Sequence, residues 1–259
     1  MRVLVTGGTG VLGREVVPRL VDAKHVVRVM SRRSGESNAL GDVEWAKADI
    51  MTGEGLADAV RHVEIIVHCA SSPFKKTAET DVEGTRKLLE SAKEAGVSNF
   101  YYISIVGIDR IKFAYYKSKL AAEKVVEDGG VPYTILRATQ FHPLLADNML
   151  PMMKKGPFMF LPGAVKFQLI DPGEVADHIV ATLANGPGGR LPDIGGPQVQ
   201  TAKEIAQEWK AATGKSYIAI PVPSVGFLSG MAKAYNCCPD HVGGKITFRE
   251  WLAKRYPAS

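Results

Sequence analysis

The feature that most constrains the fold is a run of glycines close to the start of the chain. Gly7, Gly10 and Gly13 follow the spacing G-x-x-G-x-x-G, between an apolar strand-like run at residues 2–6 and a helical pattern at residues 11–23. In such a unit the glycines permit a tight turn, a close approach of backbone to phosphate and close helix–strand packing. The amides at the helix start then face negative charge. The spacing predicts a bound dinucleotide, and the alternative is a glycine-rich structural turn. The loop residues expected to contact the cofactor are Gly7, Thr9, Gly10, Val11, Leu12 and Gly13.

Strand-like runs and helical patterns alternate through the first half of the chain. The strand-like runs lie at residues 2–6, 25–31, 43–49, 64–70, 99–104 and 133–138, and the helical patterns at residues 11–23, 55–61, 80–96 and 114–130. This alternation predicts a parallel sheet with helices on both faces, and the nearly continuous apolar strands agree with burial on both sides. We therefore predict an α/β fold with a doubly wound parallel sheet of the Rossmann type. Its ligand is expected beyond the carboxyl ends of the strands.

The pattern changes after Phe141. Residues 143–163 are rich in Met, Leu and Pro, and residues 166–186 resemble a strand, a helix begun by proline and a glycine stop. We expect a dinucleotide-binding core over residues 1–141. A smaller C-terminal substrate-binding lobe is expected over residues 142–259, built onto the same sheet, with residues 166–186 returning to the core.

Helices are also predicted in the second half. Thr201, with Glu204 three residues later, forms the sequence signature of a capping box and predicts a helix over residues 201–214. Residues 223–236 and 247–256 are expected to be helical as well. We find no repeat and no low-complexity linker, so the second half is predicted to be a lobe on the same sheet.

Composition excludes several functional classes. The 259 residues are 46% hydrophobic, which is ordinary for a globular protein. The 32 Lys and Arg exceed the 27 Asp and Glu by 5, but they are scattered, so no nucleic-acid partner is expected. We see no apolar run of membrane-spanning length and no signal peptide. Cys69, Cys237 and Cys238 match no disulfide or zinc pattern. We expect a cytoplasmic protein that binds neither a membrane nor a metal ion. A homodimer is possible.

The end of the second strand distinguishes between the two nicotinamide cofactors. Proteins that bind NAD place a carboxylate there for the ribose hydroxyl. This chain has Ser31, Arg32 and Arg33 and no acid before Glu36. Arginine makes planar, bidentate contacts with phosphate oxygens, which suits a 2′-phosphate. We therefore predict NADP(H) over NAD(H), and the alternative is a pair of surface arginines.

A second group of polar residues follows the fifth strand. Ser104 ends that strand, and Tyr115 and Lys119 are four residues apart on a predicted helix, so they share one face. A neighbouring lysine is expected to lower the pKa of the tyrosine, which makes Tyr115 a candidate general acid toward a carbonyl. Ser104 could donate to the same oxygen. Two alternatives remain. Tyr116, three residues before Lys119, could form the pair instead of Tyr115, or the tyrosine could only pack the helix while the lysine ammonium group is solvated.

These motifs together resemble the short-chain dehydrogenase/reductase superfamily, in its atypical NmrA-like branch. The resemblance rests on T-G-G-T-G-x-x-G at the N-terminus, on Ser104, and on the Y-x-x-x-K of Tyr115 and Lys119. The stretches SRRS, YYISIVGID, YYKSKLAAE and LRATQFH add to it, and it covers about residues 1–185. It implies that Tyr115 protonates a substrate oxygen as hydride arrives from nicotinamide. Lys119 also holds the nicotinamide ribose, and Ser104 orients the carbonyl.

The resemblance also implies cofactor contacts after three later strands. Residues after the third strand match the adenine site of the family, and residues after the fourth match the loop that lines the cofactor. Residues after the sixth strand flank the nicotinamide. In this chain these positions are Asp49 and Ile50, then Cys69, Ala70 and Ser71, and then Ala138, Thr139 and Phe141.

The second half is expected to supply the substrate pocket. Met and Phe side chains make an adaptable apolar wall, although core packing is the alternative for each of them. Of the candidates only His142 is titratable, and packed histidines are common. The candidates are Phe141, His142, Met149 and Met152, with Met153, Phe158 and Phe160 beyond them.

The function expected from these residues is reduction. We predict an NADP(H)-dependent oxidoreductase that reduces a carbonyl, an imine or a conjugated double bond of a small apolar molecule. The family also contains members that bind the cofactor without known turnover. The alternative is therefore a non-catalytic NADP(H)-binding redox sensor that acts through a protein partner. An isomerase or epimerase with tightly held NAD(H) is a third option, against which Arg32 and Arg33 argue.

Overall fold

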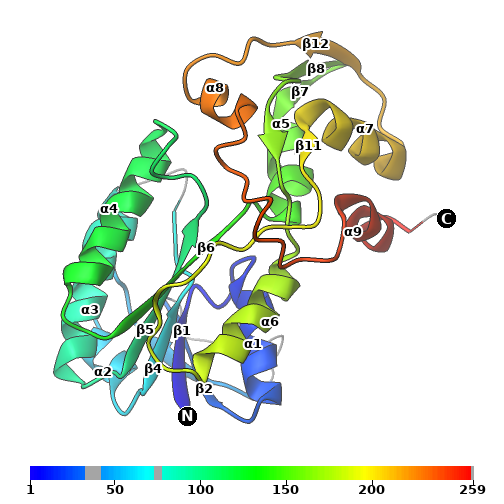
Figure 1. Cartoon of the computed structure of the whole chain (residues 1–259). Coiled ribbons are helices and arrows are strands. Elements are labelled where there is room, and N and C mark those ends of the chain that lie inside the picture. Colours follow the sequence, from blue (N-terminus) through cyan, green and yellow to red (C-terminus); the bar gives the residue numbers. More distant parts are fainter. Residues whose placement is uncertain (33–41, 73–77, 258–259) are drawn as a thin grey trace. The chain divides into compact units, whose positions relative to one another are not determined.

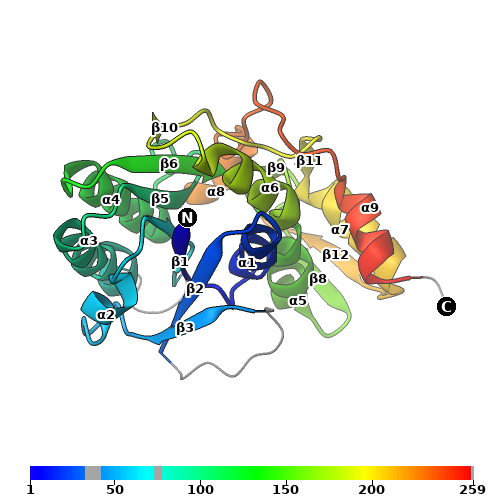
Figure 2. The ribbon, with the colours of Figure 1, turned by 90° about the horizontal axis from the view of Figure 1, so that it is seen from below.

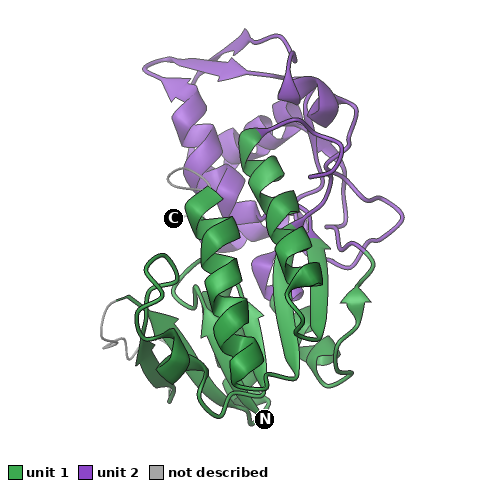
Figure 3. Ribbon diagram, turned by 90° about the vertical axis from the view of Figure 1, so that its left-hand side faces the viewer, with its two compact units in different colours: residues 1–104, 114–137, 176–192 green, residues 105–113, 138–175, 193–259 purple. Residues whose placement is uncertain are grey.

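The chain forms two compact units. The computed structural model describes residues 1–32, 42–72 and 78–257. Unit 1 comprises residues 1–104, 114–137 and 176–192, and unit 2 comprises residues 105–113, 138–175 and 193–259 (Figure 3). The division expected at residue 141 stays a prediction, since the chain crosses between the units several times.

Unit 1 is built on a seven-stranded sheet in the order β10-β6-β5-β4-β1-β2-β3 (Figure 1). Val3 of β1 lies opposite Val27 of β2 on one side and Ile65 of β4 on the other, in parallel register. The order reverses between β1 and β4, where doubly wound sheets bind their ligands. The predicted doubly wound sheet is confirmed. The strands are β1 (Arg2–Thr6), β2 (Val26–Ser31), β3 (Glu44–Lys47), β4 (Ile65–His68), β5 (Asn99–Ile105), β6 (Tyr133–Ala138) and β10 (Gly189–Arg190).

Helices cover both faces of this sheet (Figure 2). Side chains alternate along each strand, so neighbouring residues serve opposite faces. Tyr102 of β5 belongs to the core beneath α2, α3 and α4. Tyr101 points the other way, where its hydroxyl lies 3.0 Å from Thr182 Oγ1 of α6. The helices are α2 (Leu56–Val60), α3 (Thr85–Glu94) and α4 (Ala114–Asp128) on one face, and α1 (Gly13–Asp22) and the unit 1 part of α6 (Pro172–Leu183) on the other.

The helix predicted over residues 80–96 begins differently. Its first turns form a π-helical segment, η2 (Glu79–Gly84), and α3 follows from Thr85. The Thr85 hydroxyl donates to the Asp81 backbone carbonyl at 2.7 Å. This hydroxyl competes with the backbone amide that would otherwise bond to the Asp81 carbonyl in a regular α-helix. We attribute the wider π-helical turn of η2 to this competition.

Unit 2 combines short strands with short helices. One sheet has the order β12-β8-β7, and β11 pairs with β9. Its strands are β7 (Lys154–Lys155), β8 (Phe158–Leu161), β9 (Lys166–Phe167), β11 (Gln200–Thr201) and β12 (Ile218–Pro221). Its helical segments are η3 (Leu144–Met149), α5 (Leu150–Met153), α7 (Ala202–Thr213), α8 (Phe227–Ala232) and α9 (Phe248–Arg255).

Capping explains which helices of unit 2 were predictable. The capping box of Thr201 and Glu204 is present at the start of α7, as predicted. Thr247 and Glu250 form a second capping box at the start of α9. The helix expected over residues 223–236 is shorter, because α8 begins only after Gly226, whose φ is +61°.

Candidate functional site

The glycine-rich loop joins β1 to α1 through a left-handed turn. Gly7 has a φ of +66°, and a Cβ there would lie 2.7 Å from the amide nitrogen of Ala70. A Cβ on Gly13 would lie 2.2 Å from the Gly7 carbonyl oxygen. Leu12, the N-cap of α1, makes no side-chain capping bond, while the Arg14 and Glu15 amides donate to the Gly10 and Leu12 carbonyls at 3.1 and 3.0 Å. The positive end of the helix dipole lies at this loop. This loop fits a pyrophosphate.

A groove of about 750 Å³ lies at the carboxyl ends of β1, β2, β3 and β4, across the reversal of strand order. Many residues expected to contact the cofactor line it: Gly7, Thr9, Gly10, Ser31, Arg32, Asp49, Ile50, Cys69, Ala70 and Ser71. Its other lining residues, which sequence reasoning missed, are Arg14, Met30, Trp45, Ala48, Met51, Ser72 and Thr80.

The groove carries two guanidinium groups. Arg14 and Arg32 both line it and are both exposed, while Arg33 lies outside the described residues. Among the described lining residues only Asp49 is acidic, and its Oδ1 accepts the Met51 amide at 2.7 Å. The groove is therefore lined by cationic side chains, and its one described acid, Asp49, is engaged in a turn. Such a lining suits a phosphate. The signal for Arg14 was its place directly after the last glycine of the motif.

The remaining expected cofactor residues do not line this groove. Val11, Leu12 and Gly13 belong to the loop and the start of α1, and Leu12 is buried. Ala138, Thr139 and Phe141 belong to unit 2, so their contact with a cofactor stays a prediction.

Tyr115 is connected to the groove through Ser71. The Tyr115 hydroxyl lies 2.9 Å from Ser71 Oγ, and Ser71 Oγ donates to Asp81 Oδ1 at 2.6 Å. A serine has one hydroxyl proton, so Tyr115 is the donor to Ser71. Burial raises the pKa of Tyr115 and outweighs the hydrogen bond with Ser71, which lowers it, while Asp81 raises it further. The expectation that Lys119 lowers this pKa is therefore wrong. The phenol is protonated at neutral pH, as a proton donor must be.

Lys119 is buried, with 3% of its side chain exposed. Its Nζ donates to the Ile103 carbonyl at 2.8 Å and lies 3.9 Å from Asp81 Oδ1. Burial lowers the pKa of Lys119 to about 8, although Asp81 and Glu123 act in the opposite direction. The alternative in which the Lys119 ammonium group is solvated on the helix surface therefore does not hold.

Ser104 lies near the carboxyl end of β5 and is 3% exposed. It follows Ile103, whose carbonyl holds Lys119, and alternation places it on the same sheet face as Tyr102. Among the described residues its Oγ has no hydrogen-bond partner. A buried, unpaired hydroxyl costs about 1–3 kcal/mol, and a ligand oxygen would relieve that cost.

Asp81 is the residue at the centre of this group that sequence reasoning missed. It is 1% exposed, and its carboxylate accepts from Ser71 Oγ and from the Ser72 amide at 3.1 Å. Its signal was its position in the apolar stripe of the helix, four residues before Thr85 and seven before Leu88. An acid in such a stripe needs a buried partner, and here one partner is Lys119.

His68 joins the cofactor loop to this group. Its Nδ1 lies 2.6 Å from Thr6 Oγ1, and its Nε2 lies 3.1 Å from Thr85 Oγ1. Thr85 donates to Asp81, so His68 donates through Nε2 and accepts from Thr6. Thr6 Oγ1 in turn accepts the Ala70 amide at 3.3 Å. Burial lowers the pKa of His68 to about 3, so this chain of bonds is neutral and structural.

Comparison with known proteins identifies the family. The sequence profile of the NAD(P)H-binding family matches residues 7–157, which is more than half of the chain. The chain belongs to the NAD(P)H-binding family. The predicted family resemblance is thereby confirmed.

The chain is similar to several named proteins. A (4-alkanoyl-5-oxo-2,5-dihydrofuran-3-yl)methyl phosphate reductase of Streptomyces griseus is 29% identical over 217 residues, which cover 82% of this chain and 74% of that protein. Photosystem II assembly factor Ycf39 of Guillardia theta is 25% identical over 266 residues, which cover 98% and 84%. The chain spans 66% to 84% of the length of its first curated relatives.

A solved structure shares the fold. The NADPH-dependent quinone oxidoreductase QOR2 of Escherichia coli, complexed with NADPH, superposes with a TM-score of 0.78 at 21% identity. The match covers 98% of this chain and 99% of that chain. At this identity the likeness establishes the Rossmann-type fold.

The cysteines of the NAD(P)H-binding protein are all free thiols. Burial raises the pKa of Cys69 to about 12, of Cys237 to about 11 and of Cys238 to about 12. At neutral pH none of them is a thiolate nucleophile. Within the described residues we find no metal-binding cluster of His, Cys, Asp and Glu, and no helix there has the length and apolar character of a membrane span.

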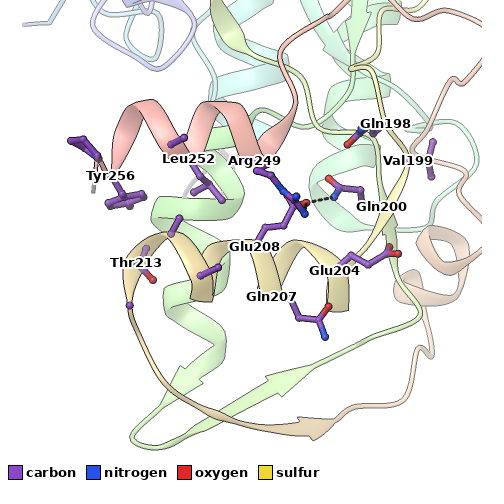
Figure 4. A pocket seen from close by; sticks show the side chains of 15 residues that line it. Gln198, Val199, Gln200, Glu204, Gln207, Glu208, Thr213, Arg249, Leu252 and Tyr256 are labelled. Carbon is purple, nitrogen blue, oxygen red and sulfur yellow. Dashed lines mark hydrogen bonds and ion pairs between the residues drawn. The ribbon is translucent and has the colours of Figure 1, made fainter. Parts of the chain in front are cut away.

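Unit 2 has a hollow of its own, of about 1230 Å³, lined mainly by α7 and α9 (Figure 4). Glu208 accepts from Gln200 at 3.1 Å and from Arg249 at 3.2 Å inside it. No residue of the predicted site lines this hollow, among those that the structure describes. The groove of unit 1 is therefore the candidate cofactor site.

The candidate substrate residues differ widely in exposure. Met152 is 60% exposed, whereas Phe141 and Met149 are half-buried. His142 is fully buried and donates from Nε2 to the Ile246 carbonyl at 3.1 Å. Burial lowers its pKa to about 4, so it is a neutral histidine packed beside Phe248. In this structure His142 has the environment of a core residue.

Proposed function

We propose that this protein is an NADP(H)-dependent oxidoreductase that reduces a carbonyl, an imine or a conjugated double bond of a small apolar molecule. The contact between Ser71 and Tyr115 carries the proposal. Ser71 lines the cofactor groove, and its Oγ lies 2.9 Å from the Tyr115 hydroxyl. A protonated phenol next to a nicotinamide-nucleotide groove is the arrangement that carbonyl reduction needs. The relatives named as a reductase and as a quinone oxidoreductase support this class.

The choice of NADP(H) rests on charge. Arg14 and Arg32 line the groove, and Asp49 is engaged by the Met51 amide. Two guanidinium groups favour a 2′-phosphate, while a free carboxylate would favour the 2′-hydroxyl of NAD. The solved relative that holds NADPH supports the same choice.

The roles of the residues follow from their protonation states. When bound, NADPH would supply the hydride. Tyr115 would donate its proton to the substrate oxygen, and Ser104 would give that oxygen a second hydrogen bond from its unpaired hydroxyl. Lys119, held on the Ile103 carbonyl, would place a positive charge at the end of β5, where the resemblance puts the nicotinamide ribose.

The test replaces the proton donor. Y115F is expected to lower kcat about a hundredfold or more with aldehydes, ketones and quinones, because general acid catalysis is lost, and to leave NADPH affinity unchanged. Y256F, which removes a hydroxyl from the C-cap residue that follows α9 in unit 2, is the control and should match the wild type. Unchanged turnover in Y115F would remove Tyr115 from the mechanism.

A second candidate is a non-catalytic NADP(H)-binding redox sensor that acts through a protein partner. One observation favours it: the Guillardia theta relative, which aligns with 98% of this chain, is named an assembly factor. This candidate predicts no turnover by the wild type across the carbonyl panel. It also predicts a protein complex whose stability differs between NADPH and NADP⁺.

A further inference from the structure

The direction of the Tyr115 hydroxyl is determined by a carboxylate that it does not touch. The Ser71 hydroxyl donates its own proton to Asp81 Oδ1, 2.6 Å away. Tyr115 must therefore be the donor in its hydrogen bond with Ser71. Ser71 is exposed, whereas Asp81 is 1% exposed. The three oxygens therefore form a hydrogen-bonded chain from the edge of the groove to a buried negative charge.

Asp81 is held in place by three further contacts. Its Oδ2 accepts the Ser72 amide at 3.1 Å, and Lys119 Nζ lies 3.9 Å from its Oδ1. The Thr85 hydroxyl donates to its backbone carbonyl at 2.7 Å. A carboxylate with these contacts presents Oδ1 to Ser71 in a constant direction.

The groups around Tyr115 favour the neutral phenol. Burial raises its pKa most, the hydrogen bond with Ser71 lowers it, and Asp81 and the neighbouring Tyr116 raise it further. Lys119 is one helical turn away, but its Nζ is directed to Ile103 and Asp81. Among the charged side chains that the structure describes, Asp81 raises the pKa of Tyr115.

We propose that Ser71 and Asp81 are positioning residues: Ser71 aims the Tyr115 hydroxyl, and the negative charge of Asp81 keeps that hydroxyl protonated until a substrate oxygen takes the proton. This inference rests on the proposed function, in which Tyr115 is the acid. In that step the O–H bond of Tyr115 breaks, the O–H bond of the product forms, and the phenolate later regains a proton from water. Asp81 acts through Ser71 and through its own charge.

The first experiment reads the proton on Tyr115 without turnover. Difluorotyrosine, which ionises at a lower pH than tyrosine, is placed at position 115, and its ¹⁹F signal is titrated with pH. D81N removes the negative charge and is expected to lower the midpoint by about one pH unit or more. D128N, at the exposed end of α4, is the control. An unchanged midpoint in D81N would overturn the proposal.

The second experiment separates aiming from folding. S71A changes an exposed side chain and should fold, and its kcat is expected to fall about ten- to a hundredfold. S71T keeps a hydroxyl and should restore most of that loss, while S118A, elsewhere on α4, should match the wild type. Equal rates for S71A and S71T would contradict the aiming role. If Y115F kept full turnover, the proposed function would fail, but the fluorine titration would still decide the role of Asp81.

Discussion

At the scale of single residues, function depends on a few charges and protons. The glycine spacing and Arg32 were predictable, because they act through local backbone geometry and position in the motif. The raised pKa of Tyr115 was not predictable. Helical spacing places Lys119 on the same face, but its Nζ turns to the Ile103 carbonyl and to Asp81. Those partners are 16 and 38 residues away in the chain, beyond the reach of any local pattern.

Arg32 provides a prediction about cofactor choice. R32A is expected to weaken NADPH binding about tenfold or more, because a charge-assisted contact with the 2′-phosphate is lost. NADH, which lacks that phosphate, should bind R32A and the wild type alike. Titration by the fluorescence of the reduced cofactor measures both. R61A, which removes an exposed arginine at the end of α2, is the control. Equal losses for NADPH and NADH would contradict the phosphate contact.

Lys119 provides a prediction about pH and stability. Its native pKa is about 8, below the ordinary 10.5, so the unfolded chain binds more protons between these pH values. The Lys119 contribution to the free energy of unfolding therefore rises with pH in this window. The wild type should gain roughly 1–3 kcal/mol relative to K119M between pH 8 and pH 10. Urea unfolding measures the difference, and K117M, at an exposed lysine, should show no such trend.

At the scale of elements, the strands and helices of unit 1 follow from their patterns. The apolar runs match β1, β2, β4, β5 and β6, because buried parallel strands need continuous apolar residues. In unit 2 the strand expected at the start of residues 166–186 matches β9. The strands β7, β8 and β11 were missed, since two to four residues carry no readable period. The π-helical η2 was missed because a tertiary hydrogen-bond network, through Thr85, widens the turn.

Thr85 tests that network at the level of the element. T85V keeps the volume of the side chain but leaves the His68 Nε2–H and the Asp81 carbonyl without their hydroxyl partner. We expect the free energy of unfolding to fall by about 1–3 kcal/mol, as for other buried polar groups left unpaired. Chemical denaturation measures this change. T52V, at an exposed threonine, should stay within about 0.5 kcal/mol of the wild type, and a similar small change in T85V would contradict the account.

At the scale of the whole molecule, sheet order and family are established and the reaction is proposed. The strand order reverses between β1 and β4, and the groove lies at that reversal. This much could be predicted, because connection handedness and strand alternation leave few arrangements. The substrate could not be predicted, because the residues expected to contact it belong to unit 2, where the sequence patterns are weak and where His142 is packed in the interior.

The most direct test of the central claim follows the hydride itself. The wild type is incubated with NADPH carrying deuterium at C4 of the nicotinamide, together with a panel of aldehydes, ketones and quinones, and the products are analysed by mass spectrometry. The account predicts oxidation of NADPH with at least one of these compounds and deuterium in the reduced product. It also predicts faster turnover with NADPH than with NADH. Absence of NADPH oxidation across the whole panel would contradict it.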